Sequence, residues 1–305
     1  SVERAMMMIA SVRKPDVVVL IDYPGFNLRF AQKIRHLGVK IVYYISPQVW
    51  AWNPGRVKKM KGLIDKMLVV FPFEEEIYKK EGIPVEFVGH PLLESLEEPL
   101  GRDEFCKRYD LDPTKPILGL FPGSRKQEVE RIFPSMLGAA RILYGADEVE
   151  TVVGVAPVMD MEYMKSFLRD DFPVKLVHHA TYDTMSNSDA ALVTSGTATL
   201  EAACYKTPMV VVYKTSWLTY LIGKFMVKIK NIGLVNIVAG KQVVPEYIQG
   251  KVKPFRLAVE AAAMIEDPAR KHRIKQELAM IREKLGTKGA SSRVADAIGA
   301  ISGKG

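Results

Sequence analysis

An aspartate, Asp22, stands directly after a run of apolar residues and directly before a Tyr-Pro-Gly turn. A carboxylate in such a position, with its pKa raised by partial burial, can accept a proton from a hydroxyl group. Aspartate is also a common helix cap and a common partner of loop amides, and the spacing alone favours this simpler role. Asp22 is therefore a candidate general base with a structural alternative.

Two other clusters combine small residues with hydroxyl groups, and each stands between an apolar run and a helical pattern. Together they comprise Gly123, Ser124, Arg125, Ser195, Gly196 and Thr197. Backbone N–H groups at such turns can bind an anion, and an arginine can form a bidentate pair with phosphate. Neither cluster has the G-x-x-x-x-G-K-[ST] or the G-x-G-x-x-G spacing, which argues against an ATPase loop and a nicotinamide site. An ordinary turn with a solvated arginine explains the first cluster equally well.

Glu201 lies one helical turn beyond the second cluster. There its carboxylate could accept two hydrogen bonds from the hydroxyl groups of a ribose. A favourable charge near a helix N-terminus is the simpler explanation of the same residue.

The histidines and cysteines do not have the spacing of a metal site or of a thiol mechanism. His90, His178 and His179 form no H-x-x-x-H pattern, so we expect no metal. Cys106 and Cys204 stand far apart and without an adjacent base, which argues against zinc, a disulfide framework and covalent thiol chemistry. A reducing compartment is the simplest interpretation.

The net charge of +8 is concentrated in one segment, because residues 202–245 contain no Asp or Glu. Within it, the stretch from Lys214 to Lys230 places apolar side chains at helical spacing among lysines, as in a helix on an anionic membrane surface. A packed helix whose lysines reach the solvent fits equally well. No run of about 18 uncharged apolar residues predicts a spanning helix. The arginines and aromatic platform of a nucleic-acid-binding surface are also missing.

Apolar runs alternate with helical patterns along both halves of the chain. In the first half we expect strands over residues 16–22, 40–45, 66–70 and 85–88, with helices over 26–37, 54–63 (capped by Asn53) and 74–80. In the second half we expect strands over 117–121, 150–154, 174–177, 190–193 and 209–212, with helices over 128–143, 161–168, 197–205 and within 254–301. This order predicts an α/β fold with two parallel sheets, whose ligands bind beyond the carboxyl ends of the strands.

A segment rich in proline and acids, residues 90–103, marks the expected boundary between two domains. The predicted domains are residues 1–98 and 99–287, with a last helix over 288–305 that packs back on the first domain. Asp22 then ends a predicted strand, Arg125 follows one, and Glu201 lies in the first turns of the helix after another.

Several stretches closely resemble the lipid-A-disaccharide synthase family. They are VVLIDYPGFNLRFA, YYISPQVWAWNPGRVKKMK, DKMLVVFPFEEEIYKKEGIPVEFVGHPLLE, GLFPGSRKQEVERIFP, VTSGTATLEAACYKTPMVVVYK and GLVNIVAGKQVVPEYIQ. The resemblance covers nearly the whole chain, and SPQVWAW and SGTATLE are its most specific parts. It implies a GT-B type glycosyltransferase with two Rossmann-like domains and an interdomain cleft.

The resemblance also implies an inverting transfer that needs no metal and no cofactor. The donor is UDP-2,3-diacylglucosamine, the acceptor is the 6-hydroxyl group of 2,3-diacylglucosamine 1-phosphate (lipid X), and the product is the β-1,6-linked disaccharide 1-phosphate of lipid A. Such enzymes are cytoplasmic and peripheral on the inner membrane of Gram-negative bacteria. Another UDP-sugar transferase, a 2-epimerase-like enzyme or a non-catalytic protein that binds UDP or membranes remains the alternative, and the oligomeric state remains open.

The resemblance assigns expected roles to individual residues. Asp22 corresponds to the general base and Arg125 to the contact of the donor pyrophosphate. Expected around the nucleotide are Gly123, Ser124, Ser195, Gly196, Thr197, Glu201 (on the ribose), Asn236 and Gln249. Expected on the acceptor side are Asn27, Ser46, Gln48, Trp50 and Trp52.

The two tryptophans follow the strand expected over residues 40–45. If that segment is extended, their two-residue spacing places both rings on one face. Composition alone favours core packing, whereas the resemblance favours a rigid apolar wall of the interdomain cleft. The basic run after them is expected near a phosphate or a headgroup, and it contains Arg56, Lys58, Lys59 and Lys61.

One departure from the family concerns the beginning of the chain. Members of the family open with a strand and a Gly-rich loop of the type G-E-x-S-G-D, and neither appears before Asp22 here. The resemblance therefore implies that the first domain is incomplete, and it leaves open whether this chain is active.

Overall fold

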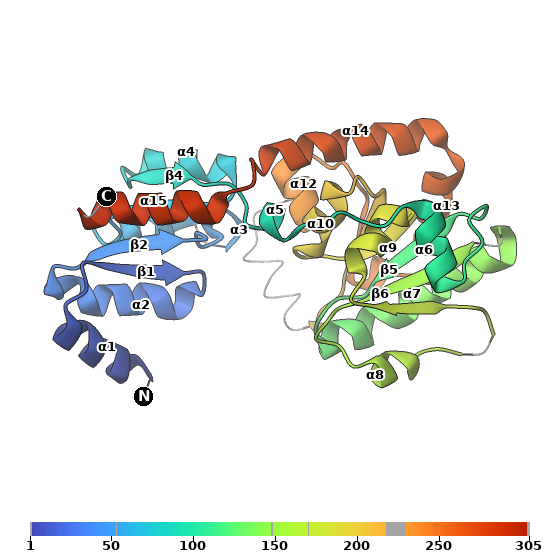
Figure 1. The fold of residues 1–305 in the computed structure, drawn as a ribbon, viewed down its shortest axis with the longest axis horizontal. Helices are drawn as coiled ribbons and strands as arrows, with labels where there is room; N and C mark the ends of the chain where they lie inside the picture. The colour runs from blue at the N-terminus through green and yellow to red at the C-terminus, as the bar shows by residue number, and fades with distance from the viewer. Residues whose placement is uncertain (1, 53, 148, 170, 218–229, 304–305) are drawn as a thin grey trace. The chain divides into compact units, whose positions relative to one another are not determined.

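The structure of the chain is a computed structural model that describes residues 2–52, 54–147, 149–169, 171–217 and 230–303 (Figure 1). Its described residues form two compact units. The first contains residues of the ranges 1–95 and 284–305, and the second contains residues of the ranges 96–217 and 230–283. Each unit has its own parallel sheet, which confirms the predicted α/β class with two such sheets.

The sheet of the first unit has the strand order β1-β2-β3-β4. The strands are β1 (Val17–Ile21), β2 (Lys40–Tyr44), β3 (Lys66–Val69) and β4 (Val85–Phe87). Around them stand α1 (Val2–Arg13), α2 (Pro24–Ile34), η1 (Arg35–Leu37), α3 (Val49–Trp52), η2 (Pro54–Met60), α4 (Pro72–Lys80), α5 (Leu92–Ser95) and α15 (Ala290–Ser302). Because the chain runs through the four strands in order, every connection crosses to the next parallel strand.

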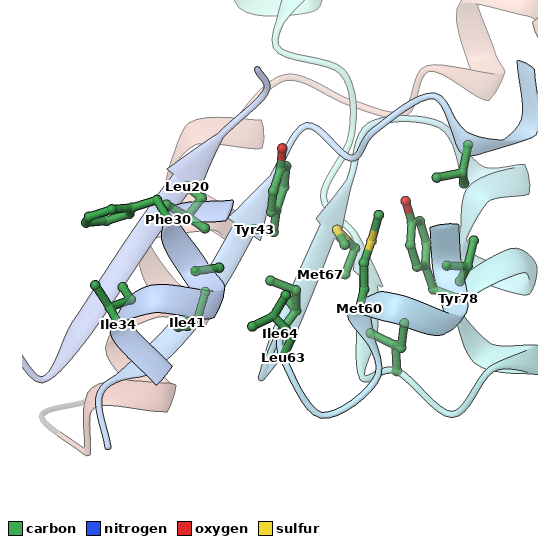
Figure 2. Packing of buried hydrophobic residues seen from close by; sticks show 14 of the residues in the cluster. Leu20, Phe30, Ile34, Ile41, Tyr43, Met60, Leu63, Ile64, Met67 and Tyr78 are labelled. Carbon is green, nitrogen blue, oxygen red and sulfur yellow. The ribbon is translucent and has the colours of Figure 1, made fainter. Parts of the chain in front are cut away.

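Both faces of this sheet are covered, as the unbroken apolar character of its strands requires. Along β2, Ile41 and Tyr43 join one buried cluster, which includes Phe30 of α2 and Met60 of η2 (Figure 2). Val42, which points to the opposite face, packs in a second cluster with residues of α15. The last helix of the chain thus covers the sheet formed by the first residues.

The sheet of the second unit has the order β10-β9-β8-β5-β6-β7. The strands are β5 (Ile117–Phe121), β6 (Glu150–Val155), β7 (Lys175–His178), β8 (Ala190–Thr194), β9 (Met209–Tyr213) and β10 (Glu246–Ile248). The remaining elements are α6 (Arg102–Tyr109), α7 (Lys126–Asp147), α8 (Met161–Lys165), α9 (Thr181–Asn187), α10 (Ala198–Cys204), α12 (Leu234–Ala239), η3 (Gln249–Lys251), α13 (Pro254–Glu266) and α14 (Pro268–Lys284).

This strand order contains one reversal. From β5 the chain proceeds outward through β6 and β7, and it then returns to place β8 on the other side of β5. β5 and β8 are buried along their whole length, so they form the centre of the sheet. The loops that follow them diverge at this switch point, and a crevice for a ligand forms at such points in open α/β sheets.

The local structure differs from the sequence prediction around the two tryptophans. The segment that carries Trp50 and Trp52 is the short helix α3, so the extended backbone on which a shared face of the two rings was expected is absent. The helix expected over residues 54–63 is the 3-10 helix η2. Its expected cap, Asn53, lies outside the described residues.

Among the described residues, no helix has the length and apolar character needed to cross a membrane.

Candidate functional site

The loop after β5 carries Gly123, Ser124 and Arg125 and leads into the long helix α7. Gly123 has a φ of 109°, a conformation that side chains other than glycine rarely adopt. A Cβ atom at this position would lie 2.8 Å from Oε2 of Glu128. The backbone N–H groups of Gly123 and Ser124 make no hydrogen bond to any described residue. The glycine therefore keeps two amide donors open at the N-terminus of a helix, the arrangement that suits an anion.

Arg125 extends from the same loop with 80% of its side chain exposed. Its guanidinium Nη1 lies 3.0 Å from Oε1 of Glu128, one turn along α7. An exposed ion pair of this kind stabilises a protein by about 0 to 1 kcal/mol. A bidentate bond to phosphate is stronger, so Arg125 can leave Glu128 and turn to an anionic ligand at little cost.

The loop after β8 carries Ser195, Gly196 and Thr197 and leads into α10. Ser195 is held by the fold, because its N–H donates to the carbonyl of Val212 at 2.9 Å and its hydroxyl donates to the carbonyl of Ile232 at 3.1 Å. Gly196 has a φ of 150°, and a Cβ atom there would face open space. Gly196 and Thr197 are thus the residues of this loop whose N–H groups are open toward a ligand, since neither bonds to a described residue.

Glu201 lies on α10 and belongs to a group of partly buried polar side chains. Burial raises the pKa of its carboxyl group, and the hydroxyl of Tyr182, which donates to Oε1 at 3.3 Å, offsets part of this effect. The ring of Tyr182 packs against that of Tyr205 in a tilted arrangement, with ring centroids 5.4 Å apart. The hydroxyl of Tyr205 donates to the carbonyl of Glu97 at 2.7 Å, and burial raises its pKa to about 12. Glu201 is therefore held in place on the wall of the crevice.

A cavity of about 580 Å³ lies between these loops, entirely within the second unit. Its wall includes seven predicted residues, namely Gly123, Ser124, Arg125, Ser195, Gly196, Thr197 and Glu201. Phe121 forms part of the floor, where Gly154 makes room for its ring: a Cβ on Gly154 would lie 2.5 Å from that ring. The volume falls within the range of about 300 to 1,000 Å³ that is usual for small-molecule sites.

The charges around the cavity are mixed. The described wall contains four carboxylates, those of Glu97, Glu128, Asp183 and Glu201, and the guanidinium of Arg125. An anionic group would consequently bind near Arg125 and the open amides, while the carboxylates suit the hydroxyl groups of a ligand. The sequence had singled out only Glu201 from this acidic set.

Two residues predicted at the nucleotide do not line this cavity. Asn236 is fully buried, and its amide donates to the carbonyl of Val244 and to the carboxylate of Glu246 while its oxygen accepts from two backbone N–H groups. Gln249 exchanges two hydrogen bonds with the backbone of Thr215. Both side chains therefore hold loops together. Glu246, which sequence reasoning missed, also accepts from the N–H groups of residues 232 and 233.

Asp22 follows β1 in the first unit and stands exposed, so the partial burial expected from the sequence is absent. Asp22 and Tyr23 both adopt positive φ angles, 48° and 38°. The carbonyl of Asp22 accepts hydrogen bonds from the amide of Asn27, at 2.7 Å, and from the hydroxyl of Tyr43. The turn is thus fixed through its backbone, and the carboxylate makes no hydrogen bond to a described residue.

The predicted acceptor-side residues are largely bonded to the protein. The buried carboxylate of Glu74 accepts from the hydroxyl of Ser46 at 2.8 Å, from Nε1 of Trp50 at 3.1 Å and from the N–H of Phe71 at 3.2 Å. Burial raises the pKa of Glu74 even so. Gln48 is exposed, and the side chain of Trp52 is outside the described structure. Sequence reasoning missed Glu74, whose position at the third residue of α4 is that of a helix cap.

No group of three or more histidine, cysteine or acidic side chains among the described residues could hold a metal ion. Both cysteines are buried, and burial raises the pKa of the Cys204 thiol to about 11.

The chain matches the model of a family described as lipid-A-disaccharide synthetase over residues 2–298. A lipid-A-disaccharide synthase of Syntrophus aciditrophicus is 47% identical over 285 residues, which cover 92% of this chain and 74% of that protein. One of Geobacter sulfurreducens is 42% identical over 308 residues, which cover 99% of this chain and 80% of that protein.

Several solved structures share the fold at low sequence identity. S. aureus MnaA in its UDP co-structure has a TM-score of 0.66 at 13% identity and covers 99% of this chain and 80% of its own. A UDP-GlcNAc 2-epimerase from Neisseria meningitidis, bound to UDP-GlcNAc, gives 0.61 at 14%, with coverage of 97% and 80%. The calicheamicin glycosyltransferase CalG4 gives 0.60 at 14%, with coverage of 99% and 77%. These likenesses show the GT-B fold.

Proposed function

Because the chain belongs to the lipid-A-disaccharide synthase family and is an enzyme of that family, a glycosyltransferase, we propose that it carries out the family's transfer with the residues described above. The donor is UDP-2,3-diacylglucosamine and the acceptor is 2,3-diacylglucosamine 1-phosphate. The observation that carries the proposal is the cavity at the switch point of the second sheet, where open amides and Arg125 meet a partly buried Glu201.

In the proposed binding mode, the pyrophosphate of the donor lies against the N–H groups of Gly123, Ser124, Gly196 and Thr197, with Arg125 turned toward it. The carboxylate of Glu201 accepts hydrogen bonds from the ribose hydroxyl groups. These donors are fixed by the fold before the reaction, so they can stabilise the charge that develops on UDP as it departs. Asn236 and Gln249 do not contact the donor in this binding mode. They act indirectly, by holding loops in place through their hydrogen bonds.

We propose the following chemical step. The oxygen of the acceptor 6-hydroxyl group attacks the anomeric carbon of the donor, and the bond between that carbon and the phosphate oxygen breaks. The hydroxyl proton passes to the carboxylate of Asp22, and the electron pair of the broken bond leaves with UDP. Attack opposite the leaving group inverts the anomeric centre and gives the β-1,6 linkage. Support for Asp22 comes from its backbone, which the turn fixes, and from its carboxylate, which is exposed.

The test is turnover of UDP-2,3-diacylglucosamine by the Asp22→Asn and Arg125→Ala variants. We expect each to lower kcat/KM by at least about a hundredfold, since general base catalysis contributes roughly 10²- to 10⁴-fold. Glu76→Gln, a change at an exposed residue of α4, is the matched control and should leave turnover unchanged. If both site variants keep turnover within tenfold of the wild type, the assignment of roles is wrong. Equal turnover of a donor without acyl chains would favour another UDP-sugar enzyme.

We also propose that the protein works at the surface of the inner membrane, where both acylated substrates reside. The lysine-rich stretch 214–230 lies mostly outside the described residues. In the described structure, α1 exposes Val2, Met8, Ile9 and Val12 beside arginines, which suits contact with a bilayer. Co-sedimentation with anionic vesicles should fall when Lys224, Lys228 and Lys230 are replaced by Glu. Unchanged sedimentation would remove this role of the lysines.

A further inference from the structure

A second cavity, of about 550 Å³, lies in the first unit between α2 and η2. Its lining comes from one face of α2, where Gly25, Leu28, Arg29 and Gln32 recur at helical spacing, and from Gly55, Arg56, Lys59, Met60 and Leu63. The opposite face of α2 is buried in the core through Phe30 and Ile34. The cavity therefore lies on the solvent-facing side of α2. It is separate from the cavity of the second unit.

The rim of the second cavity is cationic and uncompensated. Arg29, Arg56 and Lys59 are exposed, and no described acidic residue belongs to the lining. None of the three makes an ion pair or hydrogen bond with a described residue. Several other cations of this unit have carboxylate partners: the ion pairs are Lys33 with Glu3, Arg35 with Asp65, Lys66 with Glu86 and Lys79 with Glu75. What distinguishes Arg29, Arg56 and Lys59 is that all three line one cavity whose described lining contains no carboxylate.

The floor of the same cavity is apolar. Met60 and Leu63 are buried, and Leu28 is half-buried. A cavity with an apolar floor and a rim of three cations matches a molecule that combines an anionic group with hydrocarbon. Phosphate is an anionic group that both arginine and lysine commonly bind in proteins.

We propose that this cavity binds the phosphate of a phosphorylated amphiphile, and that its natural occupant is the 1-phosphate end of the acceptor. This identification of the occupant rests on the function proposed above. Gly25 follows the Asp22–Tyr23–Pro24 turn, so the helix that lines the cavity begins at the proposed general base. An acceptor phosphate held here keeps the sugar in the same unit as Asp22.

The test compares the double variant Arg56→Gln/Lys59→Gln with the control Lys79→Gln/Lys80→Gln. The control removes the same charge from exposed lysines that do not line the cavity. In steady-state assays with varied 2,3-diacylglucosamine 1-phosphate, the cavity variant should raise the acceptor KM at least about tenfold. Its kcat and donor KM should stay within about threefold, and the control should match the wild type. An unchanged acceptor KM, or an equal loss in the control, overturns the proposal.

Two further measurements distinguish an acceptor phosphate from a membrane headgroup, and the phosphate site from the proposed function. If the cavity variant loses binding to phosphatidylglycerol vesicles but keeps its acceptor KM, the cations bind membrane headgroups and the acceptor assignment is wrong. Calorimetry with dodecyl phosphate, with neutral dodecyl maltoside as control, tests the cavity without turnover. Weaker binding of dodecyl phosphate by the cavity variant, in a protein that makes no disaccharide, would retain the phosphate site and reject the proposed function. Equal binding of dodecyl phosphate by the wild type and the cavity variant would reject the phosphate site.

Discussion

The carboxyl ends of the two sheets use their side chains differently. In the second unit, the loops after β5 and β8 carry glycines whose backbone conformations keep amide groups open around a cavity. In the first unit, the side chains after β2 and β3 bond to one another, with Ser46 and Trp50 donating to Glu74. The loops of the second unit present backbone donors to a ligand. In the first unit, the side-chain donors bond to another side chain of the protein and stabilise the fold.

This difference separates residues that bind from residues that position. Trp50 resembles a ligand contact by its type and place in the sequence, yet its indole N–H is already committed to a buried carboxylate. Asp22 is the contrary case in the same unit, because only its backbone is engaged. The comparison predicts that changes in the second unit act on nucleotide affinity, and that changes around Glu74 act on stability.

The largest effect is expected from Gly123→Val. The valine would require a left-handed backbone and would meet Glu128, so the loop must move away from the position that opens its amides. We expect UDP affinity, measured by calorimetry, to fall by at least about thirtyfold, or roughly 2 kcal/mol. Gly145→Val, at an exposed helical glycine of α7 with free space around it, is the matched control. Equal affinities of the two variants would contradict the anion role of the loop.

A comparable effect, but on stability rather than on affinity, is expected from Glu74→Gln. The amide nitrogen cannot accept a hydrogen bond, so at least one of the donors Ser46, Trp50 and Phe71 loses its partner in a buried place. The expected loss in unfolding free energy is about 1 to 3 kcal/mol in urea denaturation. Glu76→Gln should change it by no more than about 0.5 kcal/mol. If the two variants are equally stable, the hydrogen bonds to Glu74 do not stabilise the segments that follow β2 and β3.

The pH dependence of stability provides a third test. It concerns His90, whose ring packs against Phe71 of the Glu74 cluster. Burial lowers the pKa of His90 to about 4, and its Nδ1 accepts a hydrogen bond from the N–H of Leu92 at 3.1 Å. Because the folded state holds the imidazole neutral, the unfolded state binds more protons between pH 6.5 and about 4. Stability is therefore full above pH 6.5 and falls as the pH decreases through this window, by up to roughly 3 kcal/mol.

His90→Asn is the matched variant for this measurement, since the asparagine oxygen can accept the same hydrogen bond without titrating. The difference in unfolding free energy between wild type and variant should shrink as the pH falls from 7 to 4. A difference that stays constant over this range would show that His90 does not titrate as described.

The fold was predictable because its signals are local. The continuous apolar runs of β5 and β8 indicate strands buried on both faces, and the glycine of the loop after β5 indicates a special backbone conformation. Because both loops follow parallel strands, Gly123 and Gly196 were expected at the same edge of the sheet. The reversal of strand order, which brings β8 beside β5, was not visible in the alternation of elements.

What the sequence could not predict are roles that depend on distant partners. Asn236 has the type of a ligand-binding residue, but its hydrogen bonds go to Val244 and Glu246, and only the three-dimensional structure reveals that they exhaust its polar atoms. The segment with Trp50 forms a short helix, and its indole N–H donates to Glu74, a partner that is distant in the sequence. The type of a side chain indicates which hydrogen bonds it can make. The packing of the folded chain determines the partner with which it makes them.

The central claim is that the open strand ends of the second unit, and not the cationic cavity of the first, hold the nucleotide. Calorimetric titration of UDP into the Arg125→Ala variant and the Arg56→Gln/Lys59→Gln variant tests it most directly, because all three cations are exposed and their loss should not disturb folding. Arg125→Ala should weaken UDP binding at least about tenfold, as expected for the loss of a charge-assisted hydrogen bond, and the double variant should bind UDP like the wild type. The reverse pattern would contradict the account.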